Sequence, residues 1–222
     1  MRDLLVTEIF HSLQGEGAFT GERFSFIRLT GCNLRCTYCD SSYAFKNGLK
    51  RSITEVLTAI APFKTKHVLL TGGEPLLQRQ TPALVQALHK KNYLISIETH
   101  GQFSFASVRE YARIVMDIKT PGSGMYRDTF YQNIDLLRSS DEVKFVLTSK
   151  NDYKWAQDLI LSEKTLNRAR IIFSPAVPAP NMPGSFEGVS LKWVAEKIIE
   201  DQLPVRLQTQ FHKTIWGNQR GV

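Results

Sequence analysis

The 222-residue sequence has little cysteine, and it has no long hydrophobic run and no long block of charge of one sign. No stretch reaches the roughly 18 apolar residues that a membrane-spanning helix needs, so we expect no membrane partner. The longest Lys/Arg runs are pairs, at Lys50-Arg51 and Lys90-Lys91, and no nucleic-acid-binding motif occurs. We therefore interpret the net charge of +7 as a basic surface with a site for anionic small molecules, and expect no nucleic-acid partner.

The first residues lack the apolar stretch of a secretory signal and include acidic side chains. On that basis we expect a reducing, cytoplasmic location, where disulfides are uncommon. The length fits one domain that spans residues 1–222 and is large enough for a substantial core.

The only three cysteines, Cys32, Cys36 and Cys39, all lie in one short window. A disulfide would leave one of them unpaired. A structural zinc ion normally takes four protein ligands, so a histidine elsewhere in the chain would have to complete that site. An iron–sulfur cluster held by three thiolates leaves one iron open to a small molecule. The spacing favours the cluster and leaves zinc and a redox thiol group as alternatives.

The flanking sequence places the cysteines after a strand. The apolar, β-rich run 24–31 ends in glycine and is typical of a strand that leads into the cysteine loop. A second strand, 67–71, runs directly into Gly72-Gly73-Glu74-Pro75. Two glycines let a ligand approach the backbone closely, and Pro75 suits the first turn of a helix. A plain strand-to-helix turn is the alternative, but two such loops on consecutive strands favour a binding site.

Strand and helix signals alternate along the chain, which predicts parallel strands with right-handed crossovers. We expect strands at 24–31, 67–71, 93–98, 114–118, 142–147, 171–173 and 205–207. We expect helices at 52–61, 75–91, 105–111 and 190–200, and a further helix that begins after a cap at Asn151-Asp152. Ser52 and Glu55 form a capping box at the start of the first helix, and Thr81 caps a restart within the second. Seven strands are too few for a closed eight-stranded barrel, so the sequence predicts an α/β fold with a partial, open βα barrel. The Pro- and Gly-rich stretch 175–188 is interpreted as a lid or a dimer contact, with a surface loop as the alternative.

Several motifs together carry a family resemblance. The pattern Cx3Cx2C, followed by a strand and Gly-Gly-Glu-Pro, resembles the radical S-adenosylmethionine (SAM) superfamily. The segments 8–17, 26–40, Glu98-Thr-His-Gly101 and 207–217 resemble the 7-carboxy-7-deazaguanine synthase family. The resemblance extends from residue 8 nearly to the end of the chain, and it also implies the open barrel.

The resemblance implies three cofactors: a [4Fe-4S] cluster, SAM and Mg²⁺. The cluster ligands would be Cys32, Cys36 and Cys39, with SAM on the open iron. Mg²⁺ would bind Ser41, where the family usually has threonine; a serine hydroxyl is also a hard oxygen ligand. The implied SAM contacts are Tyr38, Cys39, Asp40, Gly72, Gly73, Glu74, Gly101, Asp117, Ile118, Lys119, Phe173, Ser174, Pro175 and Ala176. For Glu74, capping the following helix is the alternative. The chain departs from the family pattern at two places. Residues 117–119 are Asp-Ile-Lys where the family often has Ser-Pro-Lys, and residues 174–175 are Ser-Pro where the family often has Gln-Pro.

The implied substrate-binding residues are Leu13, Gln14, Gly15, Glu16, Arg28, Thr99 and His212. An arginine suits a carboxylated substrate because its guanidinium can bind a carboxylate through two parallel hydrogen bonds, although a structural ion pair is the alternative for Arg28. Gln14 and Glu16 suit the donor–acceptor edge of a pterin, with a simple turn as their alternative.

The activity that the resemblance implies is that of a radical SAM lyase. A 5′-deoxyadenosyl radical would take a hydrogen atom from 6-carboxy-5,6,7,8-tetrahydropterin, the ring would contract, and ammonia would leave. The product, 7-carboxy-7-deazaguanine, leads to queuosine and related 7-deazapurines. A flavodoxin or ferredoxin would supply electrons, and a homodimer is the family expectation. The alternatives are a radical SAM activase that acts on a partner protein, and a zinc-binding interaction module without catalysis.

Overall fold

A computed structural model describes residues 3–127, 130–178, 182 and 184–222, and in these residues nine strands form one sheet. The order across the sheet is β3-β1-β2-β4-β5-β6-β7-β8-β9. The strands are β1 (Leu4–Leu13), β2 (Arg23–Leu29), β3 (Leu49–Arg51), β4 (His67–Gly72), β5 (Leu94–Thr99), β6 (Ala112–Asp117), β7 (Glu142–Leu147), β8 (Arg170–Pro175) and β9 (Arg206–Leu207). The helices are α1 (Ile53–Ile60), α2 (Thr81–Lys90), α3 (Tyr131–Ile134), α4 (Lys150–Ser162), α5 (Leu191–Glu200) and α6 (Phe211–Trp216).

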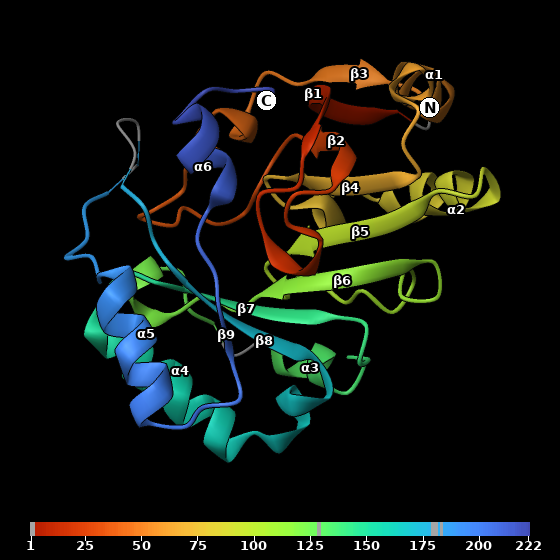
Figure 1. The fold of residues 1–222 in the computed structure, drawn as a ribbon. Helices are drawn as coiled ribbons and strands as arrows, with labels where there is room; N and C mark the ends of the chain where they lie inside the picture. Colours follow the sequence, from red (N-terminus) through yellow and green to blue (C-terminus); the bar gives the residue numbers. More distant parts are fainter. Residues whose placement is uncertain (1–2, 128–129, 179–181, 183) are drawn as a thin grey trace.

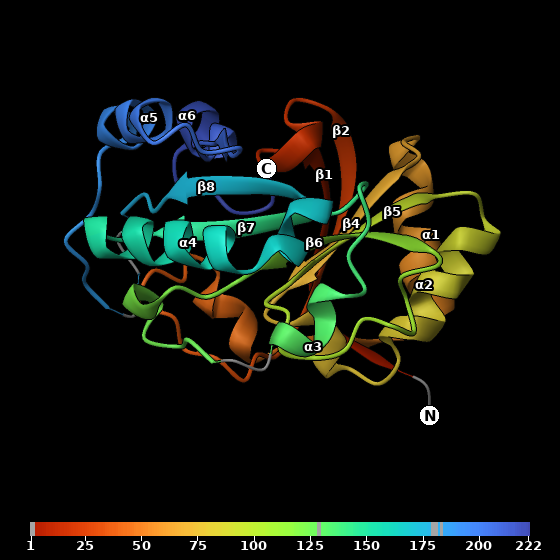
Figure 2. The same cartoon turned by 90° about the horizontal axis from the view of Figure 1, so that it is seen from below.

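The sheet is curved and mostly parallel. From β2 to β9 each neighbouring pair is parallel, whereas β1 runs antiparallel to β2 and β3. The strands curve around an interior, and α1, α2, α4 and α5 lie on the outside (Figures 1 and 2). The two edge strands, β3 and β9, do not pair with each other, so the barrel is open. The prediction of an α/β partial barrel is confirmed.

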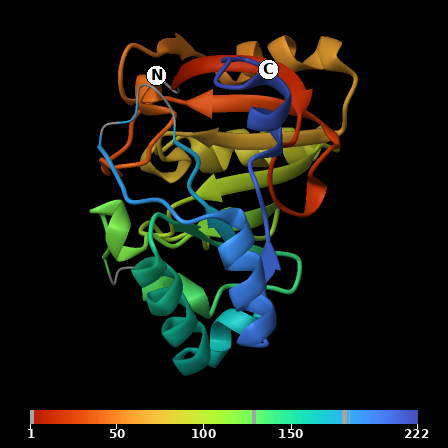
Figure 3. The same ribbon diagram turned by 60° about the vertical axis from the view of Figure 1, so that its left-hand side comes forward.

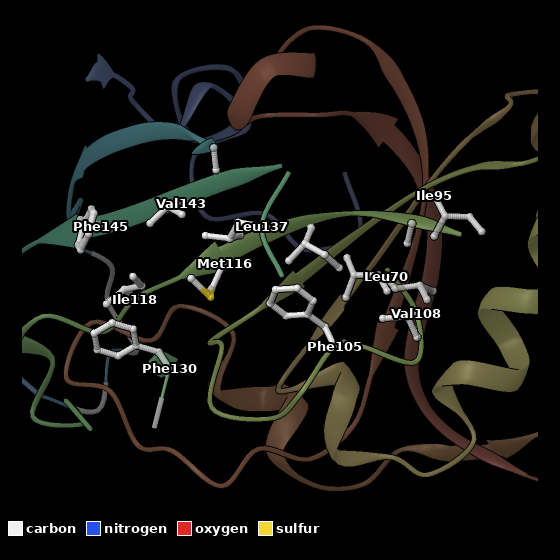
Figure 4. Packing of buried hydrophobic residues seen from close by; sticks show 14 of the residues in the cluster. Leu70, Ile95, Phe105, Val108, Met116, Ile118, Phe130, Leu137, Val143 and Phe145 are labelled. Atoms are coloured by element: carbon white, nitrogen blue, oxygen red, sulfur yellow. The ribbon is translucent and has the colours of Figure 1, made fainter. Parts of the chain in front are cut away.

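Side chains on the parallel strands alternate between the two faces of the sheet. The outward set, which includes Leu70, Met116 and Phe145, is fully buried in the main apolar cluster beneath the helices (Figure 4). The residues between them face the interior of the barrel. Because burial of the outward set fixes the register, each inward position is determined as well.

Two strands are absent from the prediction. In β1 only Leu4 and Val6 are buried and the rest of the strand is half-buried or exposed, so the strand shows no clean alternation. All three residues of β3 are exposed, and it pairs with β1 at the edge of the sheet. Such strands are stabilised by pairing rather than by a hydrophobic face, and their sequences carry little signal.

The predicted helix at 105–111 is wrong. This segment is a series of turns, in which Val108 N donates to Phe105 O at 3.0 Å and Tyr111 N donates to Val108 O at 3.0 Å. Phe105 and Val108 are buried in the core, so packing of these two side chains prevails over the helix signal.

The predicted helix starts are partly right. The capping box of Ser52 and Glu55 is confirmed at the start of α1. Thr81 is the first residue of α2 rather than its cap, and its hydroxyl donates to Pro75 O. The cap of α4 is Ser149, whose Oγ accepts from Asp152 N at 3.2 Å. The predicted cap at Asn151-Asp152 is therefore wrong by two residues.

The C-terminal segment lies over the open side of the barrel. From β9 the chain runs to α6 and ends near β1 (Figures 1 and 3). Phe211 N donates to Gly15 O at 3.0 Å, which joins this segment to the connection between β1 and β2. No helix in the described ranges combines the length and apolar character needed to cross a membrane. The lid or dimer interpretation of 175–188 includes 179–181 and 183, which lie outside the described residues.

Candidate active site

The main cavity lies inside the curved sheet, where the carboxyl ends of the parallel strands meet the cysteine loop and the C-terminal segment. Its volume is about 250 Å³, whereas a second cavity deeper in the barrel has about 10 Å³. Only the first has room for a substrate.

The three cysteines line one end of the main cavity as free thiols. Leu34 N donates to Cys32 Sγ at 3.4 Å, and Cys39 N donates to Cys36 O at 3.2 Å, so the loop folds back on itself. Burial raises the pKa of each thiol, that of Cys36 to about 11. The thiols are therefore neutral near pH 7 until a metal displaces their protons. Within the described residues, no three His, Cys, Asp or Glu side chains are arranged around a single metal ion.

Gly72 and Gly73 let the end of β4 lie directly against the end of β2. A Cβ on Gly73 would lie 2.1 Å from Gly31 O and 2.9 Å from Cys32 Cβ. Gly72 has a φ of +141°, and its Cβ would lie 2.1 Å from Leu29 O. The glycine pair thus places the cysteine loop next to the glycine loop, because any larger residue would separate the two backbones.

The Glu74 side chain is fully buried and does not line the cavity. It caps the 3₁₀ helix Pro75–Leu77 by accepting from Leu76 N at 2.8 Å, and it also accepts from Thr99 Oγ1 at 2.9 Å. Burial raises the pKa of Glu74 to about 7, although hydrogen bonds from backbone and Thr99 oppose the shift. Glu74 therefore makes the capping contact that the sequence offered as its alternative.

Polar atoms without protein partners lie beside the thiols. Tyr38 and Asp117 line the cavity, and their buried Oη and Oδ1 atoms make no hydrogen bond in the described part of the chain. Lys119 Nζ lies 2.9 Å from Asp117 Oδ2 and 5.4 Å from the centroid of the Tyr38 ring. Three thiols next to unpaired polar atoms and a buried cation fit an iron–sulfur cluster with a polar ligand on its open iron.

Arg28 lies on β2 and faces the same cavity. Its Nε donates to Glu8 Oε1 at 2.7 Å, so the structural ion pair that the sequence offered as the alternative is present. The two Nη nitrogens make no hydrogen bond among the described residues and remain available to a carboxylate. Phe10 and Tyr43 flank the guanidinium, with ring centroids 6.0 and 5.7 Å away.

The connection between β1 and β2 forms another wall. Gln14 Oε1 accepts from Glu16 N at 3.1 Å. Glu16 accepts from Lys144 Nζ at 2.8 Å and from Gln208 and Gln210. Burial alone would raise the pKa of Glu16, but the attraction and hydrogen bond of Lys144 outweigh it and lower this pKa to about 2. Glu16 is therefore a fixed anion.

Most residues named from the sequence are brought together. The following line the main cavity: Leu13, Gln14, Gly15, Glu16, Arg28, Cys32, Cys36, Tyr38, Cys39, Asp40, Ser41, Gly72, Gly73, Thr99, Asp117, Lys119, Ser174, Pro175, Ala176 and His212. His212 packs against Gly15, where a Cβ would lie 2.2 Å from its Nδ1.

Glu74, Gly101, Ile118 and Phe173 do not line the cavity. Ile118 and Phe173 are fully buried in the apolar cluster, one residue away from the inward-facing Asp117 and Ser174. Successive residues of a strand point to opposite faces of the sheet, so Asp117 and Ser174 point into the cavity and the residues next to them point into the apolar cluster. Gly101 has a φ of +73°, and a Cβ there would lie 2.7 Å from Met116 Cγ.

Three polar strand residues that line the cavity were not predicted: Thr71, Glu98 and Lys144. Each is a polar residue at an inward-facing position of a largely buried strand. Buried parallel strands are expected to be almost continuously hydrophobic, so polar residues at inward-facing positions are the signal that would have identified them.

Comparison with known proteins agrees with this geometry. The family model described as "Radical SAM superfamily" matches residues 26–140. A protein of Koribacter versatilis named 7-carboxy-7-deazaguanine synthase is 38% identical over 95% of this chain and 96% of its own length. A protein of the same name from Chlorobaculum tepidum is 36% identical over 99% of this chain and 97% of its own. The crystal structure of QueE from Escherichia coli has the same fold, with a TM-score of 0.73 over 96% of both chains at 21% identity.

Proposed function

The chain belongs to the 7-carboxy-7-deazaguanine synthase family of the radical SAM superfamily, and we propose that it catalyses the reaction after which that family is named. The reaction converts 6-carboxy-5,6,7,8-tetrahydropterin into 7-carboxy-7-deazaguanine with loss of ammonia. The observation that carries the proposal is a single cavity that has three thiols at one end and the free Nη nitrogens of Arg28 in its wall.

Membership of the superfamily implies a [4Fe-4S] cluster and SAM. Cys32, Cys36 and Cys39 would hold the cluster, and Tyr38 and Asp117, which line the cavity beside them, would lie next to SAM. When bound and reduced, the cluster supplies the electron that splits SAM into a radical able to take a hydrogen atom from carbon. Mg²⁺ would bind Ser41 Oγ, with substrate oxygens and water as its other ligands.

The chain's own residues bind and orient the pterin. Arg28 would bind the substrate carboxylate through its two Nη nitrogens. Glu16, held as an anion by Lys144, would accept hydrogen bonds from the pterin edge, and the Gln14 side-chain amide would add a donor. Gln210 and His212 of the C-terminal segment line the cavity and would help to cover the substrate and exclude water from the radical chemistry.

The expected electron donor, oligomeric state and location are those that the family implies. An electron donor of the flavodoxin or ferredoxin type, a homodimeric assembly and a cytoplasmic location belong to the proposal. A cavity of about 250 Å³ inside the curved sheet supports a small-molecule substrate over the protein substrate of an activase.

The test is anaerobic reconstitution with iron and sulfide, followed by incubation with SAM, Mg²⁺, the carboxytetrahydropterin and a reductant. We expect 7-carboxy-7-deazaguanine by mass spectrometry, together with 5′-deoxyadenosine. Cys36→Ala should abolish SAM cleavage, and Ser41→Ala should mainly weaken the response to Mg²⁺. A preparation that cleaves SAM yet never forms the deazaguanine would refute the proposed substrate.

A further inference from the structure

Glu98 on β5 faces both cavities of the barrel interior, and the function proposed above gives it no role. Its Oε2 accepts from Thr71 Oγ1 at 2.9 Å. Its Oε1 has no hydrogen-bond partner among the described residues, although the side chain is half-buried and lines the main cavity. One carboxyl oxygen is thus held by the protein and the other is left for a ligand.

The strand register places Glu98 next to the proposed carboxylate-binding residue. Arg28 on β2 is paired with Thr71 on β4, and Thr71 in turn donates to Glu98 on β5. Adjacent strands lie about 4.8 Å apart, so Arg28 and Glu98 are separated by roughly 10 Å across the sheet. A pterin whose carboxylate is bound at Arg28 would therefore present its reacting ring to Glu98.

The charged groups around Glu98 and Glu16 shift the pKa values of these two carboxyl groups in opposite directions. Glu16, Arg28 and Lys144 face Glu98 from the main cavity, and Arg113 and Glu142 face it from the smaller one. Burial raises the pKa of Glu98, and Lys144 offsets this only in part because its ammonium is hydrogen-bonded to Glu16. The pKa of Glu16 is lowered to about 2. Two carboxyl groups with opposite shifts in one cavity are typical of an acid–base residue beside a fixed anion.

We propose that Glu98 is the catalytic residue that transfers protons when ammonia leaves. The inference rests on the proposed function. The Glu98 carboxyl protonates the departing nitrogen, and the C–N bond breaks with its electron pair on nitrogen. The resulting carboxylate takes a proton from the neighbouring ring carbon, whose C–H electron pair forms the new double bond. Glu98 ends protonated, as it began, and the elimination needs no oxidant or reductant.

The experiment compares Glu98→Gln with the wild-type protein and with Ser96→Ala. Gln keeps the size and the hydrogen bond to Thr71 but cannot transfer a proton. Ser96 is on the same strand and the same face and lines only the smaller cavity. We expect Glu98→Gln to load the cluster, to bind 6-carboxypterin within threefold of wild type in a fluorescence titration, and to cleave SAM. Ammonia and deazaguanine should form about 100-fold more slowly, and a substrate-derived species one ammonia heavier than the product should accumulate.

The outcomes separate this inference from the function itself. If the wild-type protein forms no deazaguanine, the proposed function fails first. If the wild-type protein is active and Glu98→Gln releases ammonia at the wild-type rate, or loses substrate binding to the same extent as activity, the acid–base role is overturned. Should Glu98→Gln fail to fold, Glu98→Asp keeps the carboxyl on a shorter side chain. Ammonia release that is slowed but not abolished, with intact binding and SAM cleavage, would support the inference. Complete loss of ammonia release with intact binding and SAM cleavage would overturn it.

Discussion

Lys144 Nζ lies 2.8 Å from Glu16 Oε2, and this ion pair joins β7 to the connection between β1 and β2 across the interior of the barrel. Only 11% of the Lys144 side chain and 14% of the Glu16 side chain are exposed. The pair therefore tethers one wall of the cavity and keeps Glu16 ionised.

Lys144→Met should destabilise the protein by about 3 kcal/mol or more, because it leaves Glu16 buried without its cation. The free energy of unfolding in urea measures the effect. The matched control is Lys154→Met, which breaks the pair of Lys154 with Asp158 on α4, where both side chains are more than half exposed. That change should cost less than about 1 kcal/mol. Equal costs for the two variants would contradict the assignment of a buried pair.

The same pair predicts a pH dependence of stability. The folded-state pKa of Glu16 is about 2 against an ordinary value of 4.5, so the pair's stabilisation is complete above pH 4.5 and is lost as the pH falls towards 2. The loss amounts to about 3 kcal/mol. The advantage of wild type over Glu16→Gln in the free energy of unfolding should shrink between pH 5 and pH 2.5. An advantage that does not change with pH would show that Glu16 is not held as an anion by Lys144.

Gly73→Ala should displace the cysteine loop. The new Cβ would lie 2.1 Å from Gly31 O, which is backbone and cannot rotate away. We expect at least a severalfold loss of iron and sulfide per chain after reconstitution and a lower free energy of unfolding by about 1–3 kcal/mol. Gly21→Ala is the control, because Gly21 has a φ of +90° but no atom within 4 Å of its Cβ position. It should cost about 1 kcal/mol and leave the iron content unchanged. Full cluster loading of Gly73→Ala would contradict the close approach.

Asp152→Ala should loosen the loop at 120–124 from α4. The Asp152 carboxylate is 1% exposed and accepts from Thr148 N at 2.9 Å and from Gly122 N at 2.8 Å. Loss of these partners leaves two backbone donors unpaired, at about 1–3 kcal/mol each. Asp158→Ala on the same helix, with a side chain 59% exposed, should change the free energy of unfolding by less than about 1 kcal/mol. Similar thermal unfolding midpoints for both variants would refute the anchoring role.

Local sequence signals predicted most strands and the capping box because these depend on residues a few positions apart. The signals failed at β1 and β3, which are stabilised by pairing along the edge of the sheet. They also failed at 105–111, where Phe105 and Val108 are buried as turn residues. At 117–118 and 173–174 only Asp117 and Ser174 line the cavity, because the face to which a residue points depends on the register of its strand.

The spacing of Cys32, Cys36 and Cys39 and the glycine pair at the end of β4 favoured a cluster and indicated the superfamily from sequence alone, and segments 8–17 and 207–217 narrowed the resemblance to the family. Both signals are local, because a metal loop and a tight turn need their residues within one short segment. Tertiary structure decided that Glu16 meets Lys144 and that Glu98 faces the same cavity. Glu16 and Lys144 are 128 positions apart, and only the strand order and the inward parity of β5 and β7 bring these charges together.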